Sequence, residues 1–182
     1  MPNSARLALV CLMAAGVYAQ RFTFRFYGED AGLHNLGAQT LLQDSRGFLW
    51  VGTQNGLYQF DGRTFTGFFV RDGVPGDYIS SIAEAPNGEI WLSTTARICR
   101  KSGDRFVPVD VAGATAFPGS QPLAFAADGA TYVATNRGLA HSRGDGRFQQ
   151  LFQDGPAAGT TAWGVLRAND CLLYTSPSPR DS

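Results

Sequence analysis

The chain has 182 residues, and its 15 basic and 15 acidic side chains give a formal net charge of zero at pH 7. A chain without excess positive charge lacks the electrostatic footprint of proteins that bind nucleic acid or anionic lipid, so we expect neither partner. Its apolar content of 44%, with 22 glycines and 9 prolines, favours a globular, turn-rich chain over a disordered one.

Residues 1–19 are predicted to be a secretory signal peptide. Arg6 precedes an apolar run from Leu7 to Gly16, and Val17-Tyr18-Ala19 follows as the cleavage sequence. An apolar run of about ten residues is shorter than the roughly 20 that span a bilayer, so cleavage is favoured over an uncleaved anchor. The mature chain is therefore expected to be exported.

Residues 20–35 are expected to form an outermost strand and a loop. The stretch "RFTFRFYGEDAGL" aligns with "GRTFTGFFVRDGV" further along the chain. In this alignment Phe24 matches Phe65, and Gly32 matches Gly73 at the same spacing.

Four short strands are predicted in the next segment. They are "AQTLLQD" at 38–44, "FLWVGTQ" at 48–54, "LYQFD" at 57–61 and "TFTGFFV" at 64–70. Asn55-Gly56 predicts a type I′ hairpin turn between the second and third strands, because this turn needs positive φ at both central residues.

The segment "RGFLWVGTQNGLY" at 46–58 recurs as "NGEIWLSTTARIC" at 87–99 and as "DGATYVATNRGLA" at 128–140. Turn glycines, a large aromatic and a threonine recur at one constant spacing, and two copies share a second glycine. These repeat positions are Gly47, Gly88 and Gly129; Trp50, Trp91 and Tyr132; Thr53, Thr94 and Thr135; and Gly56 and Gly138. We interpret the aromatics as core rather than as a sugar-stacking platform, and the threonines as hydrogen-bonding rather than catalytic.

A 41-residue period of short β-type runs is the length of a four-stranded propeller blade, and no long helical stripe is present. The predicted fold is all-β: a β-propeller fragment of about three four-stranded blades with an N-terminal closing strand. Residues 36–170 would hold blades 1 to 3 and the start of blade 4, "AWGVLRAND" at 162–170. The strand in 20–35 would complete the last blade of the ring, which hides the sheet edges.

Residues 171–182, "CLLYTSPSPRDS", are predicted to be foreign to the protein, because the first eleven match a translated sequencing-library adapter. The alternative is a natural Ser/Pro linker. Three blades and a stub cannot close a ring of four to eight, so we expect the natural chain to continue. With Cys11 in the signal and Cys171 in this tail, Cys99 remains alone, and we expect a packed side chain rather than a nucleophile.

The stretch "DSRGFLWVGTQNGLYQFDG", from Asp44 to Gly62, resembles the two-component regulator propeller repeat, D-x-x-G-x-L-W-x-G-T-x-x-G-L-x-x-F/Y-D-G. The second copy keeps Gly88, Trp91 and Thr94 but has Arg97 for the later glycine. The third copy has Tyr132 in place of tryptophan. The resemblance covers roughly residues 22 to 170, with one sharp motif and two degenerate ones.

The resemblance implies the amino-terminal part of a periplasmic sensor in a bacterial inner-membrane receptor. Its output, a histidine kinase or a GGDEF domain, would lie after a downstream membrane helix. The partners it implies are an unidentified small-molecule or glycan ligand, the remaining blades of the same chain, and a second copy of the receptor. Binding would shift a two-state equilibrium by differential affinity.

Two other classes stay open: a secreted propeller enzyme of lyase or glycosidase type, and a protein-binding scaffold. Two residues separate Asp44 from Gly47, whereas a sialidase Asp-box has one, which disfavours a sialidase. The mature part has two histidines, His34 and His141, interpreted as surface residues. We therefore expect no catalytic, cofactor-binding or metal-binding residues in this chain, and ligand-binding residues cannot be named from the sequence.

Overall fold

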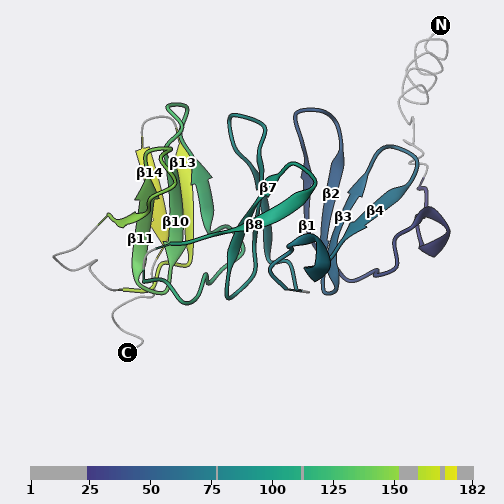
Figure 1. Ribbon diagram of the computed structural model, residues 1–182, viewed down its shortest axis with the longest axis horizontal. Coiled ribbons are helices and arrows are strands. Elements are labelled where there is room, and N and C mark those ends of the chain that lie inside the picture. Colours follow the sequence, from purple (N-terminus) through teal and green to yellow (C-terminus); the bar gives the residue numbers. More distant parts are fainter. Residues whose placement is uncertain (1–23, 77, 112, 152–159, 169–170, 176–182) are drawn as a thin grey trace, which may run out of the picture.

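The computed structural model describes residues 24–76, 78–111, 113–151, 160–168 and 171–175 (Figure 1). These residues form three four-stranded antiparallel sheets and a two-stranded one, with helix limited to the short 3-10 turns η2 (Glu29–Ala31) and η3 (Val70–Asp72). The predicted signal peptide at residues 1–19 lies outside the described residues.

Blade 1 contains β1 (Ala38–Gln43), β2 (Leu49–Thr53), β3 (Gly56–Phe60) and β4 (Phe65–Phe68). Blade 2 contains β5 (Ser81–Glu84), β6 (Ile90–Ser93), β7 (Ile98–Ser102) and β8 (Arg105–Val109). Blade 3 contains β9 (Leu123–Phe125), β10 (Thr131–Thr135), β11 (Gly138–Ser142) and β12 (Gln149–Gln150). The two-stranded sheet contains β13 (Gly164–Ala168) and β14 (Cys171–Thr175).

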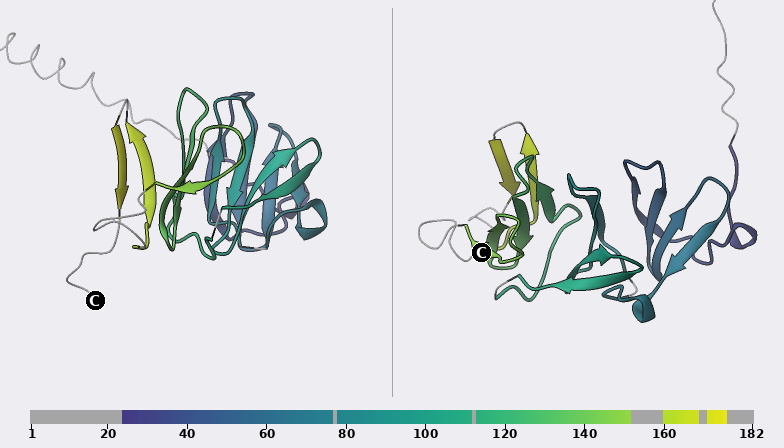
Figure 2. Two further views of the ribbon diagram at one scale, coloured as in Figure 1. Left: turned by 60° about the vertical axis from the view of Figure 1, so that its left-hand side comes forward. Right: turned by 45° about the horizontal axis from the view of Figure 1, so that its top comes forward.

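Each four-stranded sheet is a meander in which consecutive strands pair as antiparallel neighbours. The first strands of neighbouring sheets touch, since β1 contacts β5 and β9 contacts β13. The sheets follow one another around an open arc with these first strands on the inside (Figure 2). The predicted all-β propeller architecture is therefore confirmed, and the described blades do not close a ring.

The hairpin between β2 and β3 differs from its prediction by one residue. Thr53 pairs with Gly56, so Gln54 and Asn55 lie between the strands, and Gly56 begins β3 with a φ of 104°. Two residues therefore separate the strands, and Gly56 is the first residue of β3 rather than part of the turn, so the expected type I′ turn centred on Asn55-Gly56 was wrong. The Thr53 side chain closes the turn one residue earlier, because its hydroxyl oxygen accepts from the Asn55 N–H at 3.0 Å.

The N-terminal segment does not form the expected strand in residues 24–28. A β-strand needs a neighbour for its backbone groups, and these residues pair with no described strand. The expected alignment of the loop holds: η2 ends at Gly32 with a φ of 91°, and η3 ends at Gly73 with a φ of 88°. Tyr27 packs edge-on against Phe60, with ring centroids 4.9 Å apart, and so covers the outer part of blade 1.

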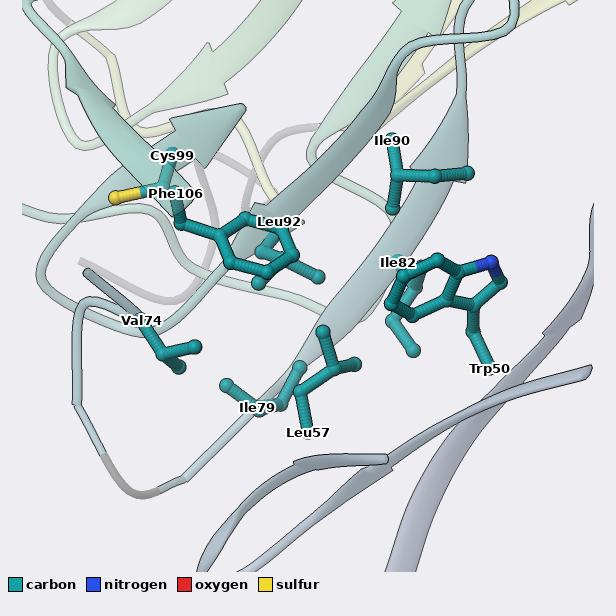
Figure 3. Packing of buried hydrophobic residues seen from close by; sticks show 9 residues of the cluster. All are labelled: Trp50, Leu57, Val74, Ile79, Ile82, Ile90, Leu92, Cys99 and Phe106. Atoms are coloured by element: carbon teal, nitrogen blue, oxygen red, sulfur yellow. The ribbon is translucent and has the colours of Figure 1, made fainter. Parts of the chain in front are cut away.

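The core lies between the sheets rather than within any one of them. The interface of blades 1 and 2 buries Trp50 and Leu57 from one side and Leu92, Cys99 and Phe106 from the other (Figure 3). On β6 the adjacent residues Trp91 and Leu92 belong to different clusters, Leu92 toward blade 1 and Trp91 toward blade 3. Successive strand residues point to opposite faces, so each middle blade supplies two interfaces at once.

At the carboxyl end, β14 pairs with β13 along its whole length, from Ala168–Cys171 to Gly164–Thr175. The β13 strand falls where the sequence predicted the start of a fourth repeat. The strand pairing does not test the predicted origin of residues 171–182, which stays a prediction.

A pair of glycines provides a test of the interblade packing. A Cβ at Gly73 would lie 1.9 Å from the carbonyl oxygen of Phe106 in blade 2, whereas one at Gly47 would meet nothing within 4 Å, although both have φ near 90°. We expect Gly47→Ala to lower the free energy of unfolding by roughly 1–2 kcal/mol, the cost of the left-handed conformation alone. Gly73→Ala should cost clearly more, as measured by urea denaturation. Equal losses for the two variants would contradict this close contact.

Candidate functional site

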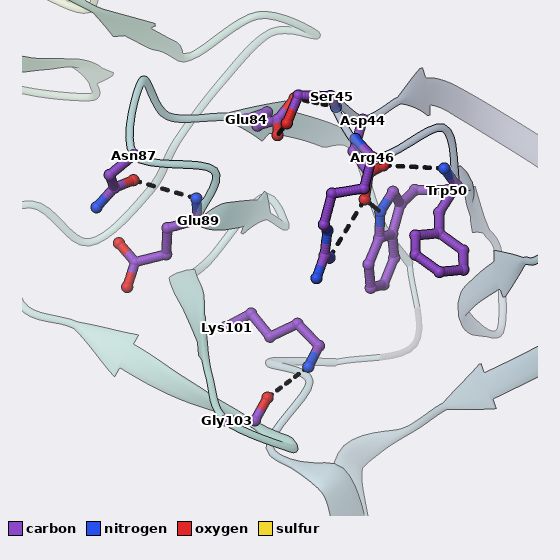
Figure 4. Close-up of polar contacts among 10 residues, drawn as sticks. Asp44, Ser45, Arg46, Trp50, Glu84, Asn87, Glu89, Lys101 and Gly103 are labelled. Carbon is purple, nitrogen blue, oxygen red and sulfur yellow. Dashed lines mark hydrogen bonds and ion pairs between the residues drawn. The ribbon is translucent and has the colours of Figure 1, made fainter.

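The sharpest motif of the sequence is a buried structural unit. The Trp50 indole Nε1–H donates to Asp44 Oδ2 at 2.9 Å, and Asp44 Oδ1 accepts from the backbone N–H groups of Phe48 at 2.9 Å and Arg46 at 3.1 Å (Figure 4). Asp44 is 4% exposed and Trp50 is fully buried. One carboxylate thus closes the β1–β2 turn and fixes the large aromatic side chain of β2.

The hydrogen bonds keep Asp44 ionised. Burial opposes the charge and raises the pKa, but the donors Trp50, Phe48 and Arg46 together outweigh it and hold the pKa of Asp44 below its ordinary value. The Arg46 guanidinium adds a weaker contact at 3.4 Å to Oδ2. All these partners come from the same turn or from β2. The Asp44 carboxylate therefore has a structural role and is not available to a ligand.

The other two repeats lack the carboxylate that accepts from Trp50 in blade 1. The Asp44 position is Ala85 in blade 2 and Ala126 in blade 3. In blade 2, Trp91 Nε1–H donates instead to Glu89 Oε2 at 3.1 Å, and Glu89 Oε1 accepts from the Arg100 guanidinium at 2.5 Å. The aromatics lie in or against the interblade clusters, as the core interpretation expected, with Trp91 7% exposed.

The repeated threonines brace the hairpins between second and third strands. The hydroxyls of Thr53, Thr94 and Thr135 donate to the carbonyl oxygens three residues later at 2.9, 3.3 and 2.8 Å. The same oxygens accept backbone N–H groups from within the turn. Their bonds lie within a blade, and the hydroxyls are occupied by the turn rather than aimed at an open site.

A polar contact also joins blades 1 and 2. The Glu84 carboxylate accepts from the Ser45 backbone N–H at 2.8 Å and from the Ser45 hydroxyl at 2.6 Å (Figure 4). Because Ser45 lies on the β1–β2 turn and Glu84 ends β5, this pair fixes the innermost corner of the interface.

Two of the hollows in the described part of the chain are of ligand size. The first, about 570 Å³, lies on the inner side of the arc along β5 and β9, with Glu84, Gln121 and Leu166 on its wall. The second, about 720 Å³, lies between blades 2 and 3 on the side of the β5–β6 and β11–β12 turns. We call this second hollow the interblade cleft. The sequence named no ligand-binding residues, because the walls of the interblade cleft come from two different blades.

The residues considered for chemistry are dispersed. His34 is exposed, as expected, and His141 is half-buried: it stacks on Tyr132 with ring centroids 6.2 Å apart, and its Nδ1 is buried without a described hydrogen bond. Cys99 is 1% exposed, and burial raises the pKa of its thiol to about 11, which makes it inert at neutral pH. This matches the expected packed cysteine.

Among the described residues, no group of three or more His, Cys, Asp or Glu side chains could hold a metal ion. No helix within the described ranges is long and apolar enough to cross a membrane.

A family model described as "two component regulator propeller" matches residues 32–55 and 73–96. These matches each run from the turn before a first strand to the hairpin after the second, in blades 1 and 2. These two segments resemble two-component regulator propeller repeats. The repeat thus includes the turn, the buried aromatic and the braced hairpin described above. A search of curated proteins found no match.

Solved structures show the same propeller fold. An extracellular domain from B. thetaiotaomicron, whose parent is described as a hybrid two-component system, is 15% identical, with a TM-score of 0.66 over 87% of this chain and 23% of that chain. A virginiamycin B lyase from Staphylococcus aureus, solved with quinupristin, is 20% identical, with a TM-score of 0.58 over 78% of this chain and 50% of the lyase. The chain therefore spans a quarter to a half of these structures, and the likeness establishes the fold alone.

Removing the carboxylate tests the structural role of the propeller motif. Asp44→Ala leaves the buried Trp50 indole N–H and two backbone N–H groups without their acceptor, so we expect a loss of about 3 kcal/mol in the free energy of unfolding. Asp104→Ala, at an exposed turn of blade 2, serves as the matched control and should change stability little. Similar losses in the two variants, measured by urea denaturation, would contradict the role given to Asp44.

The same carboxylate should make stability depend on pH. Its folded pKa lies below the ordinary 3.8, so its contribution is complete above pH 3.8 and disappears as the pH falls through the lower folded value. We expect the stability difference between the unmodified chain and Asp44→Ala to be constant near neutral pH and to shrink below pH 3.8. A difference that grows on acidification would contradict the lowered pKa.

Proposed function

We propose that this chain is the amino-terminal part of an extracytoplasmic, ligand-sensing β-propeller of a bacterial signal-transduction receptor. The observation that carries the proposal is the match of two consecutive blades to the two-component regulator propeller family. The fold likeness to an extracellular domain of a described hybrid two-component system supports it. The predicted signal peptide at residues 1–19 agrees with an exported propeller.

The geometry is suited to sensing in one particular way. Neighbouring blades share clusters of buried side chains and a polar bridge between Ser45 and Glu84, but the polypeptide joining them is a loop. A ligand held by two blades has a different affinity for each relative placement of those blades. Such differential affinity is what allows a ligand to shift an equilibrium and pass a signal to an output domain.

The output domain is proposed to lie outside the residues present. For these residues we propose no catalytic role. The alternatives are a secreted propeller enzyme and a protein-binding scaffold. The fold likeness to a virginiamycin B lyase at 20% identity does not favour catalysis, because unrelated chemistries share one fold.

Sequencing of the source gene across the codon of Asp170 to the natural stop tests this proposal. We expect a turn glycine soon after this codon, further repeats of the same length, an apolar span of about 20 residues and then a kinase or cyclase domain. An open reading frame that ends after one complete ring, with no membrane span, would overturn the receptor assignment. The secreted propeller enzyme and the protein-binding scaffold would then be favoured over the receptor.

A further inference from the structure

Three positions that line the interblade cleft carry smaller side chains than their counterparts one repeat earlier. In the interface of blades 1 and 2, Ile90 is packed in the core, and the Lys101 ammonium lies 5.8 Å from the Phe68 ring centroid. Their counterparts in the following repeat, Thr131 and Ser142, line the cleft. On the facing wall, the Asp44 position has become Ala85.

Thr131 is the most informative of these changes. It occupies a position that is apolar in both earlier repeats, Leu49 and Ile90, and it is only 6% exposed. Its hydroxyl makes no hydrogen bond to any described residue, yet it lines the cleft. The hydroxyl oxygen is not one of the fully enclosed side-chain atoms that lack a partner, so it reaches the open space of the cleft and can bond a ligand there.

A second hydroxyl lies beside it. Ser142 pairs with Thr131 across β10 and β11 and is 3% exposed. Its hydroxyl donates to Asp145 Oδ1 at 3.2 Å. The backbone N–H of Arg147 and, more weakly, this hydroxyl lower the pKa of Asp145, so the carboxylate stays ionised well into the acid range. The two hydroxyls and this charge form one continuous polar wall of blade 3.

The cleft is negatively charged. Four carboxylates line it, Glu89, Asp110, Asp128 and Asp145, against the single guanidinium of Arg100. Arg100 is bound to Glu89, and the other three carboxylates form no salt bridge within the described part of the chain. Figure 4 shows Glu89 on the turn that follows Asn87. Apolar contact is available from Pro108, Phe125 and Phe148.

We propose that the interblade cleft binds a small organic cation that carries both an ammonium group and hydroxyl groups. The ammonium group would pair with Asp145 and Asp128, and the hydroxyl groups would bond Thr131 and Ser142. The volume of about 720 Å³ suits a ligand of a few rings or fewer. This inference deepens the proposed sensor function by giving it a ligand class, and a ligand held by blades 2 and 3 would restrain their relative placement.

The test compares two probes that differ in one group. Glucosamine and glucose share the same ring and hydroxyls, but glucosamine carries an ammonium in place of one hydroxyl. Each is titrated into the full chain at about pH 6, where the amine is protonated, and binding is followed by ligand-observed NMR. We expect glucosamine to bind, and glucose to bind at least about tenfold more weakly, as the loss of a charged hydrogen bond implies.

Variants locate the binding. Asp145→Asn and Thr131→Val should each weaken glucosamine binding several-fold, and Thr131→Ser should restore it. The matched controls are Asp104→Asn, at the counterpart of Asp145 in blade 2, and Thr66→Val, on an exposed strand position; both should leave binding unchanged. Circular dichroism of each variant separates lost binding from lost folding, and Asp145, being exposed, can be replaced without disturbing the core.

Three results would overturn the proposal: no binding of glucosamine, equal binding of glucose, or binding that the Asp145 and Thr131 variants leave unchanged. Equal binding of glucose would indicate a site for neutral hydroxyl compounds. These results are independent of the gene sequence beyond Asp170, so failure of the cleft and failure of the receptor assignment are distinguished.

Discussion

The constraint on which this structure depends is that each four-stranded sheet must be covered on both faces. Leu92 and Trp91 are adjacent on β6, yet one is buried against blade 1 and the other against blade 3. A blade therefore has no core of its own; its free energy of folding comes from its neighbours, as in other repeat architectures. The arc of sheets follows, because sheets of the same build meet their neighbours at similar angles (Figure 2).

This dependence explains why the turn chemistry repeats more faithfully than the core. Each blade needs a sharp β-turn before its second strand and a closed hairpin after it, so that the apolar residues reach the correct face. Gly47, Gly88 and Gly129 all have φ between 80° and 89°, and the three hairpin threonines make the same hydrogen bonds. The aromatic that these devices position is anchored by Asp44 in blade 1 and by Glu89 in blade 2.

The two interblade interfaces differ at three matched positions. The interface of blades 1 and 2 is filled by Ile90, Lys101 and the Asp44–Trp50 unit. The next interface carries Thr131, Ser142 and Ala85 at the same positions and opens into the interblade cleft. A repeated scaffold tolerates such a change in one interface because the neighbouring interfaces are separate clusters. Thr131 brings a hydroxyl into that cleft at a position that is apolar in both earlier repeats.

The sequence by itself determined the repeat, its constant period, the all-β class and the buried role of Trp50, because turn glycines and alternating apolar residues are local signals. It placed the turn of the β2–β3 hairpin one residue too late, since the Thr53 side chain and not the Asn-Gly pair decides where the strands close. Only the tertiary structure decided that residues 24–28 stay unpaired, because a strand requires a partner edge. It alone decided that His141 lies against Tyr132 and that Thr131 faces Ala85 across a cleft, since such contacts join residues from different strands and blades whose juxtaposition no local pattern encodes.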